Sequence, residues 1–205
     1  MYEAAADPYC YPGTTVLKNK LGIRDQLALD RFEGIATAQR AEEPLPCGRL
    51  SIRYFRAIHH HLFQDVYPWA GRFRTVRISK DQSMFCYPEH VADQMKALFD
   101  DLKRRRYLQK LAADPFASEA ARFLSTLNAI HAFRDGNGRV QLAFLALLAV
   151  EADTDIRRLL KHGRHMVGAA RVDGQVVGQG EQGGKAKTLC HCANFEKIPN
   201  VFNDL

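Results

Sequence analysis

Hydrophobic residues recur at spacings of three and four along most of the chain, which predicts a protein built mainly from α-helices. Val91, Met95 and Leu98 are one clear example. Ser51 and Pro88 suit the first turns of two of these helices. The periodicity predicts helices over residues 25–40, 51–66, 88–106, 116–130, 137–151 and 155–170. The helix over 137–151 is apolar nearly all round, so we expect it at the buried centre.

One segment departs from the helical spacing. Residues 72–79 alternate, with Phe73 and Thr75 on one side and Arg74 and Val76 on the other. The apolar pair 84–85 follows after a short polar stretch. This pattern predicts a single β-hairpin over residues 72–87. The expected fold class is therefore all-α with one small β-hairpin.

Length and composition fit one globular domain. The chain has 205 residues, of which 46% are hydrophobic and 25% are charged. That is enough for one well-buried core, and the values are ordinary for a globular protein. We expect the domain to cover residues 1–170 and to begin with an extended arm over 1–20 held by aromatic contacts. Residues 171–205 are rich in glycine and glutamine and predict a loose tail.

Charge and cysteine content indicate which partners and which cellular compartment to expect. Its 29 basic and 23 acidic residues give a net charge of +6, which favours encounters with polyanions such as nucleotides. Five scattered cysteines indicate reduced thiols rather than a disulfide framework. The apolar run over 143–150 is far shorter than the roughly 20 residues that span a bilayer, and residues 1–10 lack the basic start and apolar stretch typical of a signal peptide. We therefore expect a cytoplasmic protein with no membrane partner.

Chemically active residues concentrate between two predicted helices, where residues 131–139 are His-Ala-Phe-Arg-Asp-Gly-Asn-Gly-Arg. Glycines let the backbone turn tightly and approach a ligand, and the amides that open a helix favour an anion. Arg139 suits phosphate oxygens, Asn137 can add a neutral donor, and Asp135 suits a Mg²⁺ that bridges phosphates. His131 is the candidate general base. The predicted site is a phosphate cradle formed by Asp135, Gly136, Asn137, Gly138 and Arg139.

This segment resembles the signature of Fic-domain proteins, H-x-F-x-D/E-G-N-G-R, and residues 67–80 resemble the hairpin "flap" of that family. The resemblance implies the mostly α-helical Fic fold, with the flap beside the active site. It also implies that the enzyme transfers AMP from ATP to a Ser, Thr or Tyr hydroxyl of a target protein and releases pyrophosphate. His131 would then deprotonate the hydroxyl, Asp135 would bind Mg²⁺, and Arg139 would anchor the outer phosphates. Phe133 would be a core residue that fixes the loop.

The sequence departs from the family pattern at two positions. Ala132 stands where proline is usual, which removes no catalytic group. Leu142 stands where the family has a second arginine, three residues after Arg139. Losing one charge-assisted phosphate contact would weaken binding by about 10- to 100-fold. The choice of nucleotide is therefore open, and a rival is transfer of another nucleotide or phosphorylated group.

The family's inhibitory glutamate, in the pattern Ser/Thr-x-x-x-Glu-Gly/Asn, is also not found. Glu33-Gly34 follows Leu29 rather than a hydroxyl residue, and Glu181 is followed by Gln182. The expectation is that this chain lacks its own inhibitory segment. Either a separate small antitoxin supplies an inhibitory glutamate or nothing restrains the site.

The flap residues Arg77, Ile78, Ser79 and Lys80 are the candidate docking strand for a target segment, because a hairpin edge can accept an added strand. A rival from another class is a binding module that retains the fold without catalysis. The sequence leaves open whether the protein is a toxin in its own bacterium or an effector delivered to a host.

Three other features predict no site. Residues 59–61 are consecutive histidines, which on a helix cannot converge on one metal ion. Cys190 and Cys192 offer too few ligands for zinc. The basic run 103–106 suits a solvated helix end, so we do not expect nucleic-acid binding.

Overall fold

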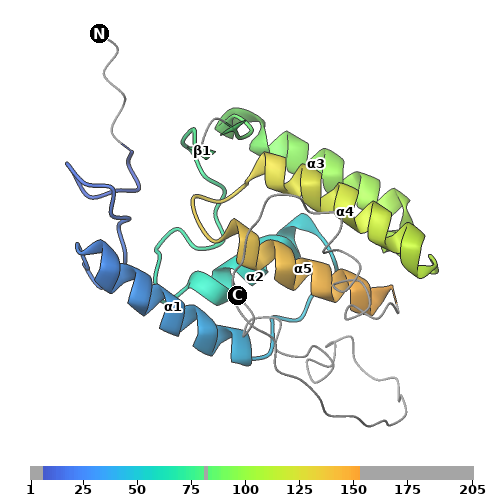
Figure 1. Cartoon of the computed structure of the whole chain (residues 1–205), viewed down its shortest axis with the longest axis horizontal. Coiled ribbons are helices and arrows are strands. Elements are labelled where there is room, and N and C mark those ends of the chain that lie inside the picture. The colour runs from blue at the N-terminus through green and yellow to red at the C-terminus, as the bar shows by residue number, and fades with distance from the viewer. Residues whose placement is uncertain (1–6, 81–82, 153–205) are drawn as a thin grey trace.

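The computed structural model describes residues 7–80 and 83–152. The described helices are α1 (Gln26–Glu42), α2 (Ile52–Phe63), α3 (Pro88–Arg104), the short 3₁₀ helix η1 (Arg106–Leu108), α4 (Ala113–Ile130) and α5 (Asn137–Glu151). The mostly helical fold that the sequence predicted is confirmed (Figure 1). The helix expected over 155–170 and the tail over 171–205 lie outside the described residues. No helix within the described ranges is long and apolar enough to cross a membrane.

Side-chain caps and proline set the starts of three helices. The Asp25 carboxylate accepts a hydrogen bond from the Ala28 amide at 2.8 Å and opens α1. The Ser51 hydroxyl accepts one from the Tyr54 amide at 3.2 Å, which confirms the predicted N-cap of α2. Pro88 occupies the first turn of α3, where its missing N–H costs nothing.

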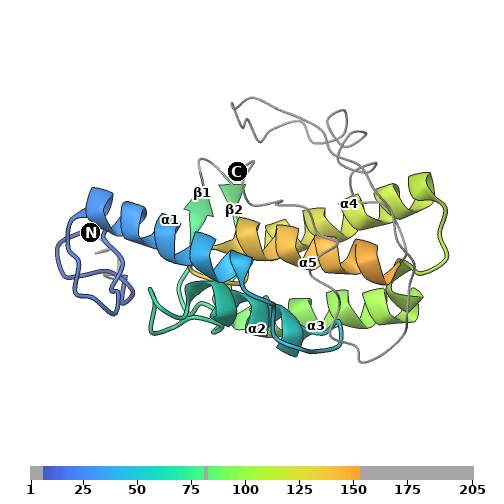
Figure 2. The same cartoon turned by 90° about the horizontal axis from the view of Figure 1, so that it is seen from below.

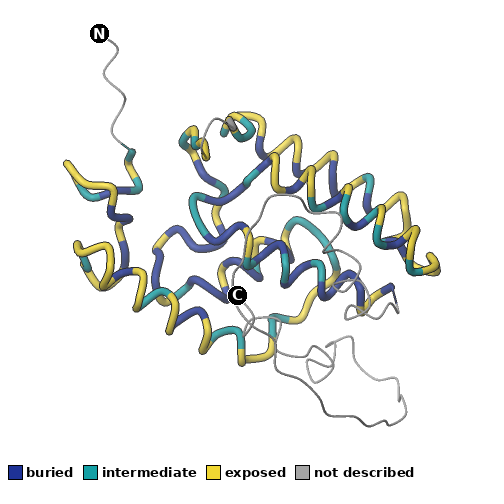
Figure 3. Tube along the Cα trace, viewed as in Figure 1, coloured by how far each residue is buried: buried dark blue, intermediate teal, exposed yellow. Residues whose placement is uncertain are grey.

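Helix α5 lies at the centre of the fold and packs against α2 and α4, while α1 packs on α2 and α3 packs on α4. Figure 1 shows α5 between α1 and the α3–α4 pair, and Figure 3 shows that most of α5 is buried. This confirms the central place predicted for 137–151. An aromatic cluster joins these helices and consists of Phe55, Phe99, Phe123, Phe133 and Phe144.

The face that α1 buries differs from the one its hydrophobic residues suggest. Leu27 and Ile35 are 60% and 62% exposed, whereas Leu29 and Ala36 are buried. A mixed, weakly amphipathic sequence does not define the buried side by itself, so the contact with α2 decides it. The consequence for the site is that α1 turns Glu33 and Thr37 inward.

The described part of the arm, residues 7–20, folds back on itself through a bridge between Cys10 and Leu17. The ring of Tyr9 packs edge-on against Trp69, with centroids 5.6 Å apart. The Tyr9 hydroxyl also accepts a hydrogen bond from the Thr75 amide at 3.2 Å. The aromatic contacts expected of the arm are therefore present.

The hairpin is shorter than the alternating pattern suggested. Strands β1 (Ser79–Lys80) and β2 (Ser83–Met84) pair antiparallel, as the two arrows in Figure 2 show. Residues 72–78 form no strand. Arg74 of this segment instead gives its amide to the carbonyl of Ala132 at 3.0 Å. The predicted hairpin exists, but its first strand is shorter than expected, because Arg74 bonds to the active-site loop and only Ile78 extends the pairing ahead of β1.

Candidate active site

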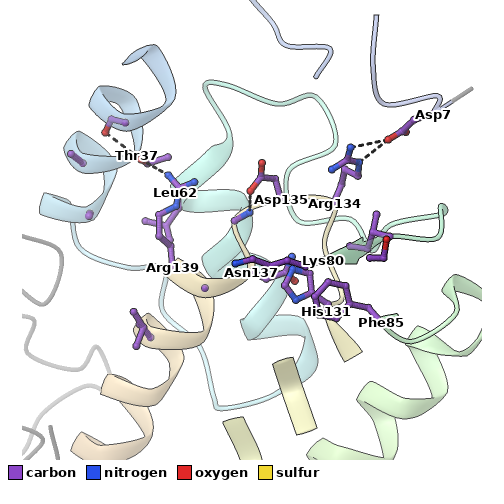
Figure 4. A pocket seen from close by; sticks show the side chains of 18 of the residues that line it. Asp7, Thr37, Leu62, Lys80, Phe85, His131, Arg134, Asp135, Asn137 and Arg139 are labelled. Atoms are coloured by element: carbon purple, nitrogen blue, oxygen red, sulfur yellow. Dashed lines mark hydrogen bonds and ion pairs between the residues drawn. The ribbon is translucent and has the colours of Figure 1, made fainter. Parts of the chain in front are cut away.

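A cavity of about 920 Å³ contains the chemically active loop. It lies between the flap, the loop over 131–139, the start of α5 and the inner side of α1. Figure 4 shows His131 and Phe85 together at one side of this pocket and Arg139 pointing toward Thr37 of α1 at the other. All six residues predicted for the base and the phosphate cradle line it: His131, Asp135, Gly136, Asn137, Gly138 and Arg139.

The end of α4 holds the imidazole of His131 in one orientation. His131 caps α4 in the left-handed conformation, with φ 49° and ψ 63°. Its Nδ1 lies 3.3 Å from the carbonyl of Asn128, and because a carbonyl only accepts, Nδ1 carries the proton. The ring of Phe85 stacks on the imidazole with centroids 3.9 Å apart and an interplanar angle of 18°. The remaining nitrogen, Nε2, is left with a free lone pair.

The surroundings of His131 keep it neutral. Burial is the main cause that lowers the pKa of His131, and the charges of Arg74 and Lys80 lower it further. Together they outweigh the hydrogen bond to Asn128, which acts in the opposite direction. An imidazole with a pKa below about 6.5 is unprotonated at neutral pH and can accept a proton.

Asp135 offers a carboxylate at the start of α5. Its Oδ1 accepts a hydrogen bond from the Gly136 amide at 2.6 Å, and in the described part of the chain Oδ2 accepts none. Magnesium is commonly held by one or two carboxylates and the phosphates of a substrate. No group of three or more acidic, histidine or cysteine ligands exists among the described residues. A single carboxylate beside an anion pocket fits a Mg²⁺ that arrives with phosphates.

Asn137 is buried at the start of α5. Its side chain is 3% exposed and closes the loop: Oδ1 accepts from the Phe133 amide at 2.9 Å, and Nδ2 donates to the Phe133 carbonyl at 2.8 Å. One N–H of Nδ2 is used in this way and, among the described residues, the second is not, so the role of this side chain as a neutral donor to phosphate stays a prediction. Asn137 contributes to the cradle by fixing the loop shape.

Arg139 is held by α1. Its guanidinium forms an ion pair with Glu33, donates to the Thr37 hydroxyl at 3.0 Å and lies 4.5 Å from the centroid of the Phe63 ring. The Tyr67 hydroxyl donates to the same Glu33 carboxylate. The sequence pattern had rejected Glu33, yet the structure places a glutamate of this chain on an arginine of the loop.

The two glycines of the loop are not equivalent. Gly136 has φ 76°, and a Cβ there would lie 2.3 Å from the Phe63 ring. Gly138 lies inside α5, and a Cβ there would meet nothing within 4 Å. Gly136 is therefore required by the fold, whereas Gly138 leaves open space at the pocket.

We expect the Gly136→Ala and Gly138→Ala variants to separate stability from binding. Gly136→Ala should lower the free energy of unfolding by about 2–3 kcal/mol, through the positive φ and the collision with Phe63. Gly138→Ala should leave stability unchanged or raise it by about 0.5–1 kcal/mol, while weakening nucleotide affinity. Urea unfolding and calorimetric titration measure the two effects, and equal stability of both variants would contradict this assignment.

Phe133 anchors the loop in the hydrophobic core, as predicted. Phe133 is fully buried and stacks on Phe55, with centroids 5.5 Å apart. The His59 ring also contacts Phe133, with ring centroids 3.9 Å apart. The Nδ1 of His59 accepts from the Gly71 amide at 2.9 Å, so Nε2 donates to the Asp135 carbonyl at 3.0 Å. His59 of the histidine run thus supports the site structurally, a role that the sequence had not indicated.

His59 should make folding stability sensitive to acid. Burial lowers the pKa of His59 from 6.5 to about 4. The unfolded chain then binds the proton first, so the stability that His59 contributes is complete above about pH 6.5 and is lost as the pH falls to 4. We expect a loss of up to about 3 kcal/mol over this interval.

Urea unfolding of wild-type protein between pH 7 and 4 checks this expectation. The His59→Gln variant should show a shallower pH dependence, whereas His60→Gln, at an exposed neighbouring position, should retain the wild-type slope. Identical slopes in wild type and His59→Gln would contradict it.

Arg74 is a site residue that sequence reasoning missed. It is 2% exposed, and its guanidinium donates to the carbonyls of His131 at 2.7 Å, Val76 at 2.6 Å and Ile130 at 3.2 Å, and also to that of Cys86. The acceptors belong to the end of α4 and to both sides of the flap. One side chain therefore ties the flap to the backbone of the candidate base.

The flap borders the same pocket. The four residues predicted for target docking line the pocket wall: Arg77, Ile78, Ser79 and Lys80. Ser79 and Lys80 form β1 and are exposed. The Phe85 amide donates to the Ile78 carbonyl at 3.3 Å and continues the pairing beyond β2.

Comparisons with known proteins agree with this geometry. The sequence model of the Fic/DOC family matches residues 49–149. The probable protein adenylyltransferase y4lH of Sinorhizobium fredii is 48% identical over 148 residues, which cover 72% of this chain and 77% of that protein. The chain belongs to the Fic/DOC family. Another member, the probable protein adenylyltransferase Fic of Escherichia coli, is 35% identical over 71% of this chain and 74% of its own length.

Solved Fic structures confirm the fold. The BepC protein of Bartonella tribocorum, a VirB-translocated effector solved with bound AMPPNP, superimposes with a TM-score of 0.63 at 29% identity. The match covers 70% of this chain and 77% of that one. The Fic-family resemblance found in the loop over 131–139 is thereby confirmed over about 70% of the chain.

Proposed function

We propose that this protein is an adenylyltransferase that moves AMP from ATP to a hydroxyl side chain of a target protein and releases pyrophosphate. The observation that carries the proposal is the neutral imidazole of His131 in the same pocket as the opening turn of α5. A proton acceptor and an anion-binding helix end are the two parts that nucleotidyl transfer to a hydroxyl requires. The names of the relatives support the same activity.

In the proposed step, Nε2 of His131 takes the proton of the target Ser, Thr or Tyr hydroxyl. The hydroxyl oxygen forms a bond to the α-phosphorus of ATP, and the bond between that phosphorus and the bridging oxygen to the β-phosphate breaks. Pyrophosphate leaves with the electron pair. The protein contributes position and charge stabilisation, with the amides at the start of α5 facing the phosphates.

We assign the Mg²⁺ of this reaction to Asp135, whose Oδ2 is available in the described part of the chain. A bound Mg²⁺ would neutralise charge on the phosphates. The amide of Gly136 orients the carboxylate toward the pocket through Oδ1.

The target segment is assigned to the flap. Arg77, Ile78, Ser79 and Lys80 line the wall of the pocket that holds His131. An extended peptide that adds beside β1 would bring its own hydroxyl residue to the imidazole, and alternate flap side chains would contact it.

The setting is proposed to be a cytosol, either that of the bacterium, where the protein would act as a toxin, or that of a host cell. The similarity to BepC, a translocated effector, supports the second. A separate antitoxin that supplies a glutamate would find no ion-pair partner at Leu142, so its control would depend on Arg139.

Transfer from two forms of labelled ATP tests the proposal. The protein is incubated with Mg²⁺ and cell lysate, with ATP labelled at either the α- or the γ-phosphate. We expect protein bands labelled from α-labelled ATP only. Bands from γ-labelled ATP would indicate phosphorylation, bands from other α-labelled nucleotides a different donor, and nucleotide binding without any band a binding module.

A further inference from the structure

The two ends of the pocket differ in the polarity of the side chains that line them. At the flap end, His131 and Lys80 face the space in front of α5. The opposite end lies between α1 and α5, and its walls include four apolar residues, Ala38, Ala41, Leu62 and Leu142. These four side chains offer no hydrogen bond to a charged group, and the Glu42 carboxylate of α1, which also lines the pocket, would repel a phosphate.

The direction of the reaction determines which part of the nucleotide reaches this end. In phosphoryl-type transfer the attacking and leaving oxygens lie roughly in line with the phosphorus. Because the hydroxyl enters at His131, the leaving phosphates extend away from it, along the opening turn of α5. The phosphate nearest the reacting phosphorus meets the helix amides, and the one beyond it reaches Arg139 and Leu142.

The positive charge of Arg139 is already compensated there. Glu33 forms an ion pair with its guanidinium, and Thr37 takes a further hydrogen bond at 3.0 Å. The Glu33 side chain is only 13% exposed, so solvent screens this pair little. The pair therefore presents almost no net charge to a terminal phosphate.

The other cations of the pocket wall are engaged elsewhere or lie at the far end. Arg134 pairs with Asp7 at 2.8 Å, and Arg77 lies 3.6 Å from Glu89. Lys80 belongs to the flap, close enough to His131 to lower its pKa. Among the described residues that line the outer end, none offers an uncompensated positive charge.

We propose that this site recognises two phosphates of its nucleotide and not the third, so that it binds nucleoside diphosphates and triphosphates with similar affinity. The proposal rests on the proposed function, because it takes the hydroxyl to enter at His131. Leu142 is the residue that sets this specificity: it stands one helical turn beyond Arg139 on the same side of α5.

Calorimetric titration of the full chain with ADP and with ATP, both with Mg²⁺, tests the proposal. We expect the two dissociation constants of the wild-type protein to agree within about threefold. The Leu142→Arg variant restores a cation at the outer end and should bind ATP about 10- to 100-fold more tightly than ADP. Val150→Arg adds the same charge at an exposed position of α5 outside the pocket and should retain the wild-type ratio.

The outcomes separate this inference from the function on which it rests. Wild-type protein that binds ATP more than tenfold more tightly than ADP would overturn the inference and leave AMP transfer intact. Wild-type protein that is folded but binds neither nucleotide would overturn the proposed function and the inference with it. A Leu142→Arg variant that is folded and still treats ADP and ATP alike would show that the outer phosphate does not reach residue 142.

Discussion

Replacing His131 with alanine is expected to lower the rate of AMP transfer by about 10²- to 10⁴-fold while nucleotide binding persists. The imidazole is the group in the described pocket that is neutral, oriented by Asn128 and placed at the flap. Without it the target hydroxyl must lose its proton to water, and the loss of a general base has an effect of this size. The phosphate cradle does not depend on the imidazole, so calorimetry should show similar nucleotide affinity in the variant.

Two further variants make this result decisive. His131 adopts a left-handed conformation, which asparagine tolerates better than alanine, so His131→Asn should lose the same rate without the backbone strain. His60→Ala removes an exposed histidine of α2 and should transfer AMP at the wild-type rate. In wild type, activity should decrease on the acid side with a midpoint below pH 6.5, because burial lowers the pKa of the base. Undiminished transfer by a folded His131→Asn protein would exclude His131 as the base.

Replacing Arg74 with methionine should lower the free energy of unfolding by about 3–5 kcal/mol. The guanidinium is buried and satisfies four backbone carbonyls at once, two at the end of α4 and two in the flap. Methionine has a similar length but no donor, and leaving buried acceptors unpaired costs about 1–3 kcal/mol for each one that water cannot reach. Urea or thermal unfolding measures the loss.

Arg72 provides a matched control for Arg74. It is an exposed arginine two positions away, and Arg72→Met should change stability by less than about 0.5 kcal/mol. Arg74→Lys retains the charge but cannot reproduce the planar fork of donors, so its stability should lie between wild type and Arg74→Met. Equal stability of Arg72→Met and Arg74→Met would show that the hydrogen bonds of Arg74 contribute nothing net.

The helices and the active-site loop could be predicted because their determinants are contiguous in sequence. Ser51 and Pro88 start helices through interactions with the next few residues. The loop over 131–139 contains its own glycine, its own closing amide Asn137 and its own buried anchor Phe133. Local information therefore indicated where the site lies.

The support of the site could not be predicted because it depends on contacts between distant parts of the chain. Arg74 meets the carbonyl of His131 across 57 positions, and Glu33 meets Arg139 across 106. In the sequence, Arg74 is one charged residue in an alternating run, and Glu33 is one carboxylate on a mixed helix. Only the packing of α1 and the flap against the loop gives them a role.

Mass spectrometry of the modified target tests the central claim most directly. Protein bands labelled from ATP are isolated after incubation with wild-type enzyme and, separately, with His131→Asn, then digested and sequenced by fragmentation. Adenylyl transfer predicts a peptide that carries an AMP group on a Ser, Thr or Tyr, present with wild type and absent with His131→Asn. A peptide that carries only a phosphoryl group, or an adenylyl group formed equally by both proteins, would contradict it.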